Sequence, residues 1–172
     1  MVVGDGAVGL SGVLAASQLG AERVIAMSRH TDRQALAREF GATDIVAARG
    51  DDGVEAVMEL TRGIGADAVL ECVGTDESVV QALRSTRSGG MVGWVGVPHV
   101  SDIPQEHMFW KNVGLRGGPA PVRGYLPDLL ERVWDGRIQP GKVFDLTMPL
   151  HQVAEAYAAM DERRSIKTLL RP

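Results

Sequence analysis

Short apolar segments alternate with amphipathic segments over residues 1–97, and turns of a few residues separate them. The apolar segments are typical of strands covered on both faces, and they lie at 1–3, 23–27, 44–47, 66–73 and 91–97. Apolar residues at helical spacing predict the intervening helices, at 7–19, 31–40, 53–61 and 77–87. Parallel strands need such crossover connections. The expected fold class is therefore α/β, a doubly wound parallel sheet with helices on both faces.

The pattern changes after Pro98. A short helix at 104–111 and a last strand at 113–116 precede a glycine- and proline-rich break at 117–121. Two amphipathic helices, at 126–134 and 153–160, and a strand at 168–170 follow. We expect a Rossmann-type domain over residues 1–117, with its first strand truncated, and a C-terminal helical and strand segment over 118–172.

Gly4, Gly6 and Gly9 form the pattern G-x-G-x-x-G between the first strand and the first helix. In a dinucleotide site the first glycine allows the tight turn, and the second leaves the backbone open to the pyrophosphate. The third lets the helix pack closely on the strand, and the N–H groups at the helix start face the phosphates. The alternative is a tight strand–helix turn without a ligand.

The second strand ends in Ser28, Arg29 and His30, where an NAD-binding domain usually has Asp or Glu for the ribose 2′-hydroxyl. Ser28 can donate a hydrogen bond to a 2′-phosphate, and Arg29 can pair with that phosphate or stack on the adenine. The sequence thus favours NADP over NAD. A solvated basic loop is the alternative, and Asp32 just beyond keeps NAD open.

Composition excludes several classes of protein. The net charge of −4, from 18 basic and 22 acidic side chains, argues against a nucleic-acid surface. No apolar run is long enough to span a membrane, and the apolar stretch from Ala7 lacks the basic leader of a signal peptide, so we expect a cytoplasmic protein. A single cysteine excludes a disulfide framework.

The segments VVGDGAVGL, ERVIAMSRH, REFGATDIV, GADAVLECVG and GGMVGWVGVP, in this order, resemble the cofactor domain of the zinc-dependent alcohol dehydrogenases. These enzymes belong to the medium-chain dehydrogenase/reductase superfamily. The resemblance covers essentially the whole chain, including the closing SIKTLLRP, which is similar to the C-terminal strand of the family. It implies transfer of hydride between a nicotinamide and an alcohol or carbonyl substrate.

The resemblance also implies roles for residues at the cofactor. Those expected at the pyrophosphate turn are Gly4, Gly6, Ala7, Val8 and Gly9. Those expected at the adenosine 2′-position are Ser28, Arg29, His30 and Arg33. Those expected at the nicotinamide and its ribose are Cys72, Val73, Gly74, Val95, Gly96, Val97, Leu115 and Gly117. Lys167 is expected to reach the pyrophosphate, with a plain surface lysine as the alternative.

No catalytic or metal-binding residue is predicted in this chain. In the family the zinc ligands come from an N-terminal substrate domain, on which the segment 118–172 would pack. Cys72 lies in an apolar strand, as expected of an inert buried thiol, and the four histidines show no metal-ligand spacing. We therefore expect the isolated chain to bind NADP(H) but to show negligible alcohol oxidation.

Three alternatives remain at this point. The chain could be the cofactor domain of a zinc-free quinone oxidoreductase, or a stand-alone nucleotide-binding module. A Rossmann-type methyltransferase is less favoured, because GGMVGWVGVP and SIKTLLRP would then be unexplained. The resemblance further implies a homodimer or larger assembly formed through the edge strands near 113–116.

Overall fold

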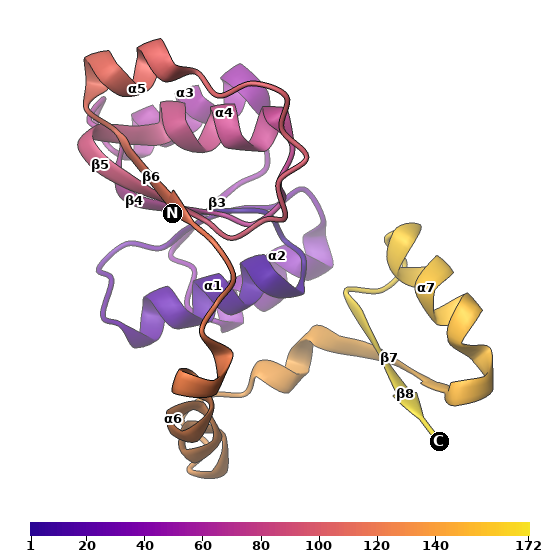
Figure 1. Ribbon diagram of the computed structural model, residues 1–172. Helices are drawn as coiled ribbons and strands as arrows, with labels where there is room; N and C mark the ends of the chain where they lie inside the picture. The colour runs from indigo at the N-terminus through magenta and orange to yellow at the C-terminus, as the bar shows by residue number, and fades with distance from the viewer. The chain divides into compact units, whose positions relative to one another are not determined.

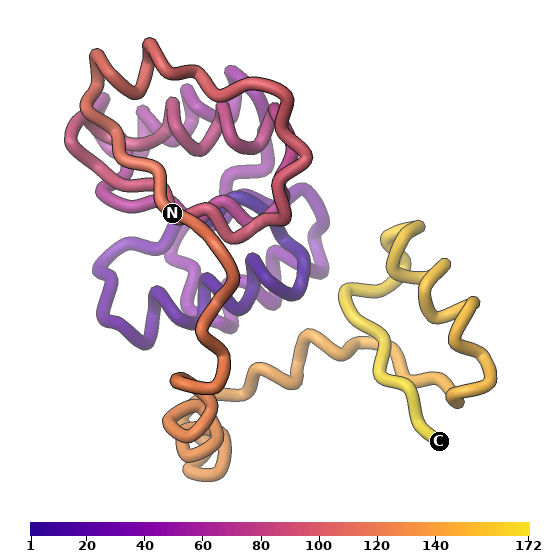
Figure 2. The backbone as a smooth tube through the Cα atoms, viewed as in Figure 1, coloured from indigo at the N-terminus to yellow at the C-terminus, as the bar shows by residue number.

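The computed structural model describes residues 1–172, and the chain divides into two compact units, Met1–Ala120 and Pro121–Pro172. The first unit is a layered α/β domain, and the second is built on a single pair of strands (Figures 1 and 2). No helix in either unit is long and apolar enough to cross a membrane.

The first unit contains one parallel sheet of six strands in the order β3-β2-β1-β4-β5-β6. The strands are β1 (Val2–Val3), β2 (Ile25–Met27), β3 (Asp44–Val46), β4 (Ala66–Glu71), β5 (Thr86–Trp94) and β6 (Gly114–Gly117). The chain reverses its direction of progress across the sheet between β1 and β4. This order is that of the Rossmann fold, so the predicted fold class is confirmed.

Helices cover both faces of this sheet, as Figure 1 shows. On one face lie α1 (Ala7–Gln18) and α2 (Thr31–Glu39); on the other lie α3 (Gly50–Leu60), α4 (Asp76–Ser85) and α5 (Gln105–Lys111). Strand residues such as Val3, Val69 and Val92 are almost fully buried between the layers. Burial of this kind on both faces explains why β1 and β2 are continuous apolar runs rather than alternating ones.

The structure corrects the boundary expected between α4 and β5. The helix ends at Ser85 rather than Arg87, and the strand already begins at Thr86. Thr86 is extended, pairs with Ala66 and donates its hydroxyl to the carbonyl of Ala82 at 2.8 Å. The β-branched Thr86 thus ends the helix before Gly89 and Gly90, both of which lie inside the strand.

The second unit contains α6 (Val122–Trp134), β7 (Phe144–Pro149), α7 (Val153–Asp161) and β8 (Lys167–Arg171), with short 3₁₀ turns on either side of β7 at Pro140–Val143 and Leu150–Gln152. β7 and β8 pair in parallel, with α7 in the crossover. Two expectations need correction. No strand was expected at 144–149, and α6 starts four residues earlier than predicted because Pro127 is tolerated inside it.

Candidate functional site

The register of the sheet places the carboxyl ends of its strands on one level. Val3 pairs with Met27 and Glu71, Met27 with Val46, Glu71 with Trp94, and Trp94 with Gly117. The residues that follow these positions therefore gather along one edge of the sheet. In open α/β sheets this edge, where the strand order reverses, is the place where ligands bind.

The glycine turn lies at the centre of this edge, between β1 and α1. Gly4 has a φ of 112°, which favours glycine, and a β-carbon there would lie 2.8 Å from Val73 Cγ2. A β-carbon on Gly9 would overlap the carbonyl of Gly4, so the helix start packs directly on the turn. Beside Gly6, by contrast, no atom lies within 4 Å of where a β-carbon would be.

The N-terminus of α1 has no capping side chain and no acidic residue in its first turn, which contains the predicted Ala7 and Val8. α4 is different, because Thr75 and Ser78 close a capping box at its start. Unsatisfied N–H groups and the positive end of a helix dipole favour an anion. Together with the open space at Gly6, this turn fits the pyrophosphate of a dinucleotide.

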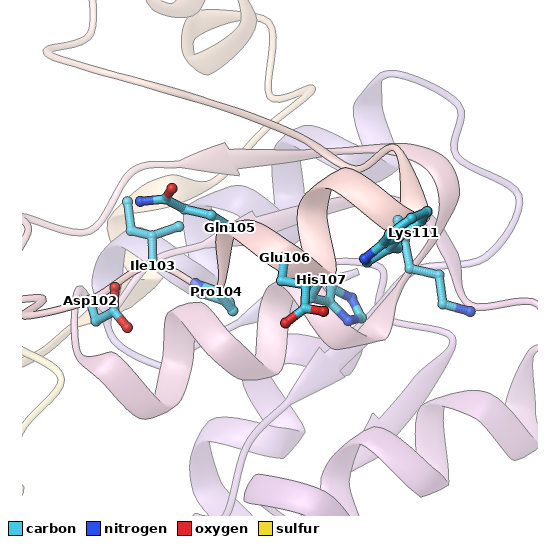
Figure 3. Close-up of a pocket in the computed structure, with 8 residues that line it drawn as sticks. Asp102, Ile103, Pro104, Gln105, Glu106, His107 and Lys111 are labelled. Atoms are coloured by element: carbon cyan, nitrogen blue, oxygen red, sulfur yellow. The ribbon is translucent and has the colours of Figure 1, made fainter.

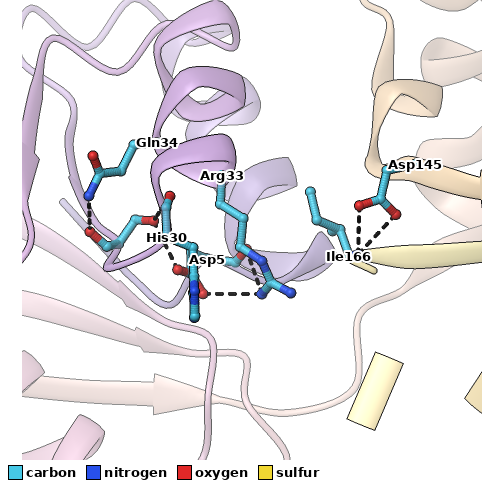
Figure 4. Close-up of polar contacts among 7 residues, drawn as sticks. Asp5, His30, Arg33, Gln34, Asp145 and Ile166 are labelled. Carbon is cyan, nitrogen blue, oxygen red and sulfur yellow. Dashed lines mark hydrogen bonds and ion pairs between the residues drawn. The ribbon is translucent and has the colours of Figure 1, made fainter. Parts of the chain in front are cut away.

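A buried polar network connects the glycine turn to the end of β2. The Ser28 hydroxyl donates to Asp5 Oδ2 at 2.9 Å, and the Arg33 guanidinium lies 3.4 Å from Asp5 Oδ1 (Figure 4). The Gln34 amide donates to the Ser28 carbonyl at 2.8 Å. Asp5, Ser28 and Arg33 are at most 5% exposed. Of the residues predicted near the adenosine 2′-position, two are therefore internal and tied to a carboxylate.

Arg29 and His30 complete this group of predicted residues. Arg29 is exposed and His30 is half-buried, and the chain turns there into α2. Sequence reasoning missed Asp5, whose carboxylate reaches Ser28 from a different segment. An acidic residue inside the glycine pattern, combined with an arginine in the first turn of α2, is the signal that points to this pair.

The turns after β4 and β5 are held together by Glu71. Its Oε1 accepts hydrogen bonds from the N–H groups of Val73 and Gly74 at 2.7 and 2.9 Å. Its carbonyl accepts from those of Val95 and Gly96 at 2.8 and 3.0 Å. Glu71 is fully buried, and its Oε2 has no hydrogen-bond partner. The predicted residues of both turns are thus fixed relative to each other through one residue, by its side chain in the first turn and by its backbone carbonyl in the second.

Cys72 follows Glu71 on the same edge and is half-buried. Burial, reinforced by the neighbouring Glu71 carboxylate, raises the pKa of the Cys72 thiol to about 12. A small cavity of about 40 Å³ opens nearby, lined by residues from the ends of β1, β2 and β4 and from α4, among them Gly4, Met27 and Val73. The Cys72 thiol is protonated at neutral pH, so it is a poor nucleophile there.

The remaining predicted residues occupy two places. Val97 is exposed beyond β5, Leu115 is half-buried within β6, and Gly117 ends β6 beside Trp94. Lys167 belongs to the second unit, where it begins β8 with an exposed side chain. All of the predicted site residues except Lys167 thus lie in the first unit, most of them at the carboxyl ends of the strands of its sheet.

A larger hollow of about 700 Å³ lies along α5, outside the predicted site. Asp102, Ile103, Glu106, His107 and Lys111 are among the residues that line it (Figure 3). His107 is engaged there with the Leu83 carbonyl at 3.3 Å. No group of three or more His, Cys, Asp or Glu side chains in the chain is arranged to hold a metal ion.

The sheet order and the glycine turn define a nucleotide-binding domain of the Rossmann class. The family model described as zinc-binding dehydrogenase matches residues 7–134. The chain therefore belongs to this family and corresponds to the C-terminal cofactor-binding portion of a medium-chain dehydrogenase, as the sequence indicated.

Similar proteins agree with this assignment. A probable zinc-binding alcohol dehydrogenase of Mycobacterium tuberculosis is 35% identical over 175 residues, which is 99% of this chain and 44% of that protein. An alcohol dehydrogenase from Thermus sp. ATN1 superimposes with a TM-score of 0.88 at 33% identity, over 98% of this chain and 50% of its own. An alcohol dehydrogenase zinc-binding domain protein from Burkholderia ambifaria superimposes with a TM-score of 0.88 at 30% identity, over 99% of this chain and 47% of its own. The chain spans about half the length of the relatives it matches.

Proposed function

We propose that this chain is the NADP(H)-binding portion of an alcohol dehydrogenase-like oxidoreductase. The observation that carries the proposal is the glycine turn at the switch point of the sheet, where open space at Gly6 adjoins an uncapped helix N-terminus. Titration of the 172-residue chain with NADPH, followed by fluorescence or calorimetry, tests it. Saturable binding is expected, and no binding of NADPH or NADH contradicts it.

Within this proposal the residues at the edge of the sheet have distinct roles. The backbone from Gly4 to Gly9 binds the pyrophosphate, and the segment 28–33 lies at the adenosine end. Val73 and Gly74, after β4, border the nicotinamide ribose. Backbone groups at 95–97 and on β6 reach the carboxamide. Lys167 is assigned to the pyrophosphate because its position resembles one where the family commonly has a basic residue.

A preference for NADP over NAD is the second part of the proposal. It is supported by the exposed cation of Arg29 and by the absence of Asp or Glu from positions 28–30. Arg29 can pair with a 2′-phosphate, which NAD lacks. Parallel titrations with NADPH and NADH test this part, and equal or tighter binding of NADH contradicts it.

Catalysis by the parent enzyme would be shared between this chain and the rest of the protein. A bound nicotinamide supplies hydride transfer to or from an alcohol or carbonyl carbon. The residues described above bind and orient that cofactor, and the turns after β4 and β5, which are both hydrogen-bonded to Glu71, fix one side of its site. The zinc ligands and the substrate pocket are proposed to lie upstream. The 172 residues alone should thus show negligible alcohol oxidation, and robust zinc-dependent turnover would contradict this.

The C-terminal segment supports the proposed arrangement with a substrate domain. No residue of α6 is buried, and Leu126, Leu129, Leu130, Val133 and Trp134 are each more than 40% exposed. A continuous apolar helix face of this kind needs a covering surface. We assign that surface to the substrate domain of the parent enzyme.

Two other functions share the same cofactor domain. A zinc-free quinone oxidoreductase would use NADPH at the same edge, and cysteine and histidine ligands in the upstream sequence would distinguish the zinc-dependent enzyme from it. A stand-alone nucleotide-binding module is favoured instead if no coding sequence is fused in frame upstream.

Self-association completes the proposal. β6 is an edge strand of the sheet, and Phe109 and Trp110 on the preceding helix are exposed. Unpaired strand edges recruit further strands, so we propose pairing of β6 with its counterpart in a second copy. Light scattering at micromolar concentration should give a dimer or a larger species, and a monomer contradicts the proposal.

A further inference from the structure

Asp5 lies inside the glycine pattern, yet its side chain turns away from the open space at Gly6 and into the protein. Asp5 is 5% exposed, and its side chain contacts two residues of the segment assigned to the adenosine end of the site. Its Oδ2 accepts the Ser28 hydroxyl at 2.9 Å, and its Oδ1 faces the Arg33 guanidinium at 3.4 Å. Figure 4 shows Arg33 pointing from α2 directly at Asp5.

The hydrogen-bond balance at Ser28 limits what this residue can offer a cofactor. A serine hydroxyl has one proton, and its acceptors here are Asp5 Oδ2 at 2.9 Å and, farther away, the His30 carbonyl at 3.5 Å. The oxygen then has only lone pairs for another partner. A ribose 2′-hydroxyl can donate to such an oxygen, whereas a fully ionised 2′-phosphate can only accept.

The pairing of Arg33 with Asp5 also disfavours a 2′-phosphate. Its guanidinium is buried and paired with the Asp5 carboxylate, so a large part of its positive potential is neutralised locally. A 2′-phosphate near this position would compete with Asp5 for the same cation. It would also meet the negative charge of Asp5 in a region shielded from water, where charge repulsion is strong.

We propose that Asp5 is a specificity-determining residue that lowers the affinity of this site for 2′-phosphorylated nucleotides. It acts by holding the Ser28 proton and the Arg33 guanidinium. This inference rests on the proposed function, because it assigns Ser28 and Arg33 to the adenosine end of a dinucleotide site. Asp5 then opposes the preference for NADP that the exposed Arg29 supports, and the ratio of the two affinities depends on both residues.

The test uses the 172-residue chain and two probes, adenosine 5′-monophosphate (AMP) and adenosine 2′,5′-bisphosphate, which differ only in the 2′-phosphate. Binding constants are measured by calorimetry for the wild type and for Asp5→Asn. Loss of the charge should raise the affinity for the 2′,5′-bisphosphate relative to AMP by about tenfold, the effect of one charge-assisted hydrogen bond. An unchanged ratio overturns the inference, because a purely structural role moves both probes equally.

Asp52→Asn is the matched control. Asp52 is exposed, lies in the first turn of α3, and its substitution removes the same formal charge. The ratio of affinities should change by less than about twofold in this variant, since exposed charges are screened. If Asp52→Asn shifts the ratio as much as Asp5→Asn, the effect comes from overall charge and the inference is wrong.

Ser28→Ala keeps the test decisive if Asp5→Asn does not fold, because it leaves the ion pair of Asp5 and Arg33 intact. It should weaken the binding of AMP at least as much as that of the 2′,5′-bisphosphate, since the hydroxyl has no proton to offer a phosphate. A selective loss of about tenfold in 2′,5′-bisphosphate affinity overturns the inference. A wild-type chain that binds NADPH and NADH while the ratios stay unchanged refutes only the role of Asp5; a chain that binds neither refutes the proposed function.

Discussion

Gly96 and Gly74 pass so close to each other that a β-carbon on Gly96 would overlap the backbone nitrogen of Gly74. The two residues belong to the turns that follow β5 and β4, and both turns are hydrogen-bonded to Glu71. The contact lets these turns lie side by side without any intervening side chain. It therefore fixes the shape of the carboxyl edge on the side assigned to the nicotinamide.

Gly96→Ala should destabilise the first unit by about 2 kcal/mol or more, because the added methyl meets backbone that cannot move aside without breaking the hydrogen bonds to Glu71. Urea unfolding monitored by circular dichroism measures the change. A free energy of unfolding within about 0.5 kcal/mol of the wild type would show that the turns separate easily.

Gly6→Ala should leave the stability of the chain unchanged and weaken the binding of NADPH. Its backbone has a φ of −78°, which alanine adopts readily, and no atom lies near the added methyl, so the unfolding free energy should stay close to that of the wild type. The methyl would occupy the space assigned to the pyrophosphate. We expect NADPH affinity to fall by about tenfold or more in the same titration used for the wild type. Equal affinity would place the pyrophosphate elsewhere.

The Cys72 thiol should react slowly in the folded chain. Burial and the Glu71 carboxylate raise its pKa to about 12, so at pH 8 its thiolate fraction is roughly a thousandfold below that of an ordinary thiol. Alkylation by iodoacetamide, followed by mass spectrometry, reports on this residue alone because the chain has one cysteine. The same chain in urea is the control and should react at the rate of a free thiol.

The raised pKa of Cys72 also makes stability depend on alkaline pH. The folded state binds the thiol proton more tightly than the unfolded chain, whose thiol has a pKa of about 8.5. The stabilisation is complete below that pH and declines as the pH rises toward 12. Cys72→Ala removes the thiol and should flatten this part of the stability profile, whereas an identical profile would assign the alkaline loss to another group.

Asp145 should control the acid stability of the second unit. Partial burial raises the pKa of Asp145, but hydrogen bonds from the Ser165 hydroxyl and from the N–H groups of Ile166 and Lys167 together hold it below its usual value. Because the folded pKa is lowered, the stabilisation is present above about pH 4 and is lost as the pH falls through the folded value.

Protection of the Ile166 amide against hydrogen exchange measures this effect, since that N–H donates to Asp145 (Figure 4). Protection factors should decline between neutral and acidic pH in the wild type. Asp145→Asn should show low protection at both, and an acid-sensitive Asp145→Asn variant would contradict the assignment.

The sheet was predictable because burial on both faces leaves a continuous apolar run in its central strands, such as Ile25–Met27 of β2. Gly4 and Gly9 were predictable because their constraint is steric and follows from the turn itself. Strand β7 was missed because its alternation of Phe144, Leu146 and Met148 is short and the partner, β8, lies in a distant segment. The hydrogen bond between Ser28 and Asp5 was missed for the same reason. It joins two turns that lie close together only after β1 and β2 have paired.

The network of Asp5, Ser28 and Arg33 has a consequence for any attempt to redesign cofactor choice. Because a single carboxylate contacts both other members, the effect of replacing one of them depends on whether the others are still present. Free-energy changes measured for single substitutions will not sum to those of combined ones. The order in which substitutions are combined to change the preferred nucleotide therefore matters, and Asp5 is the residue to replace first.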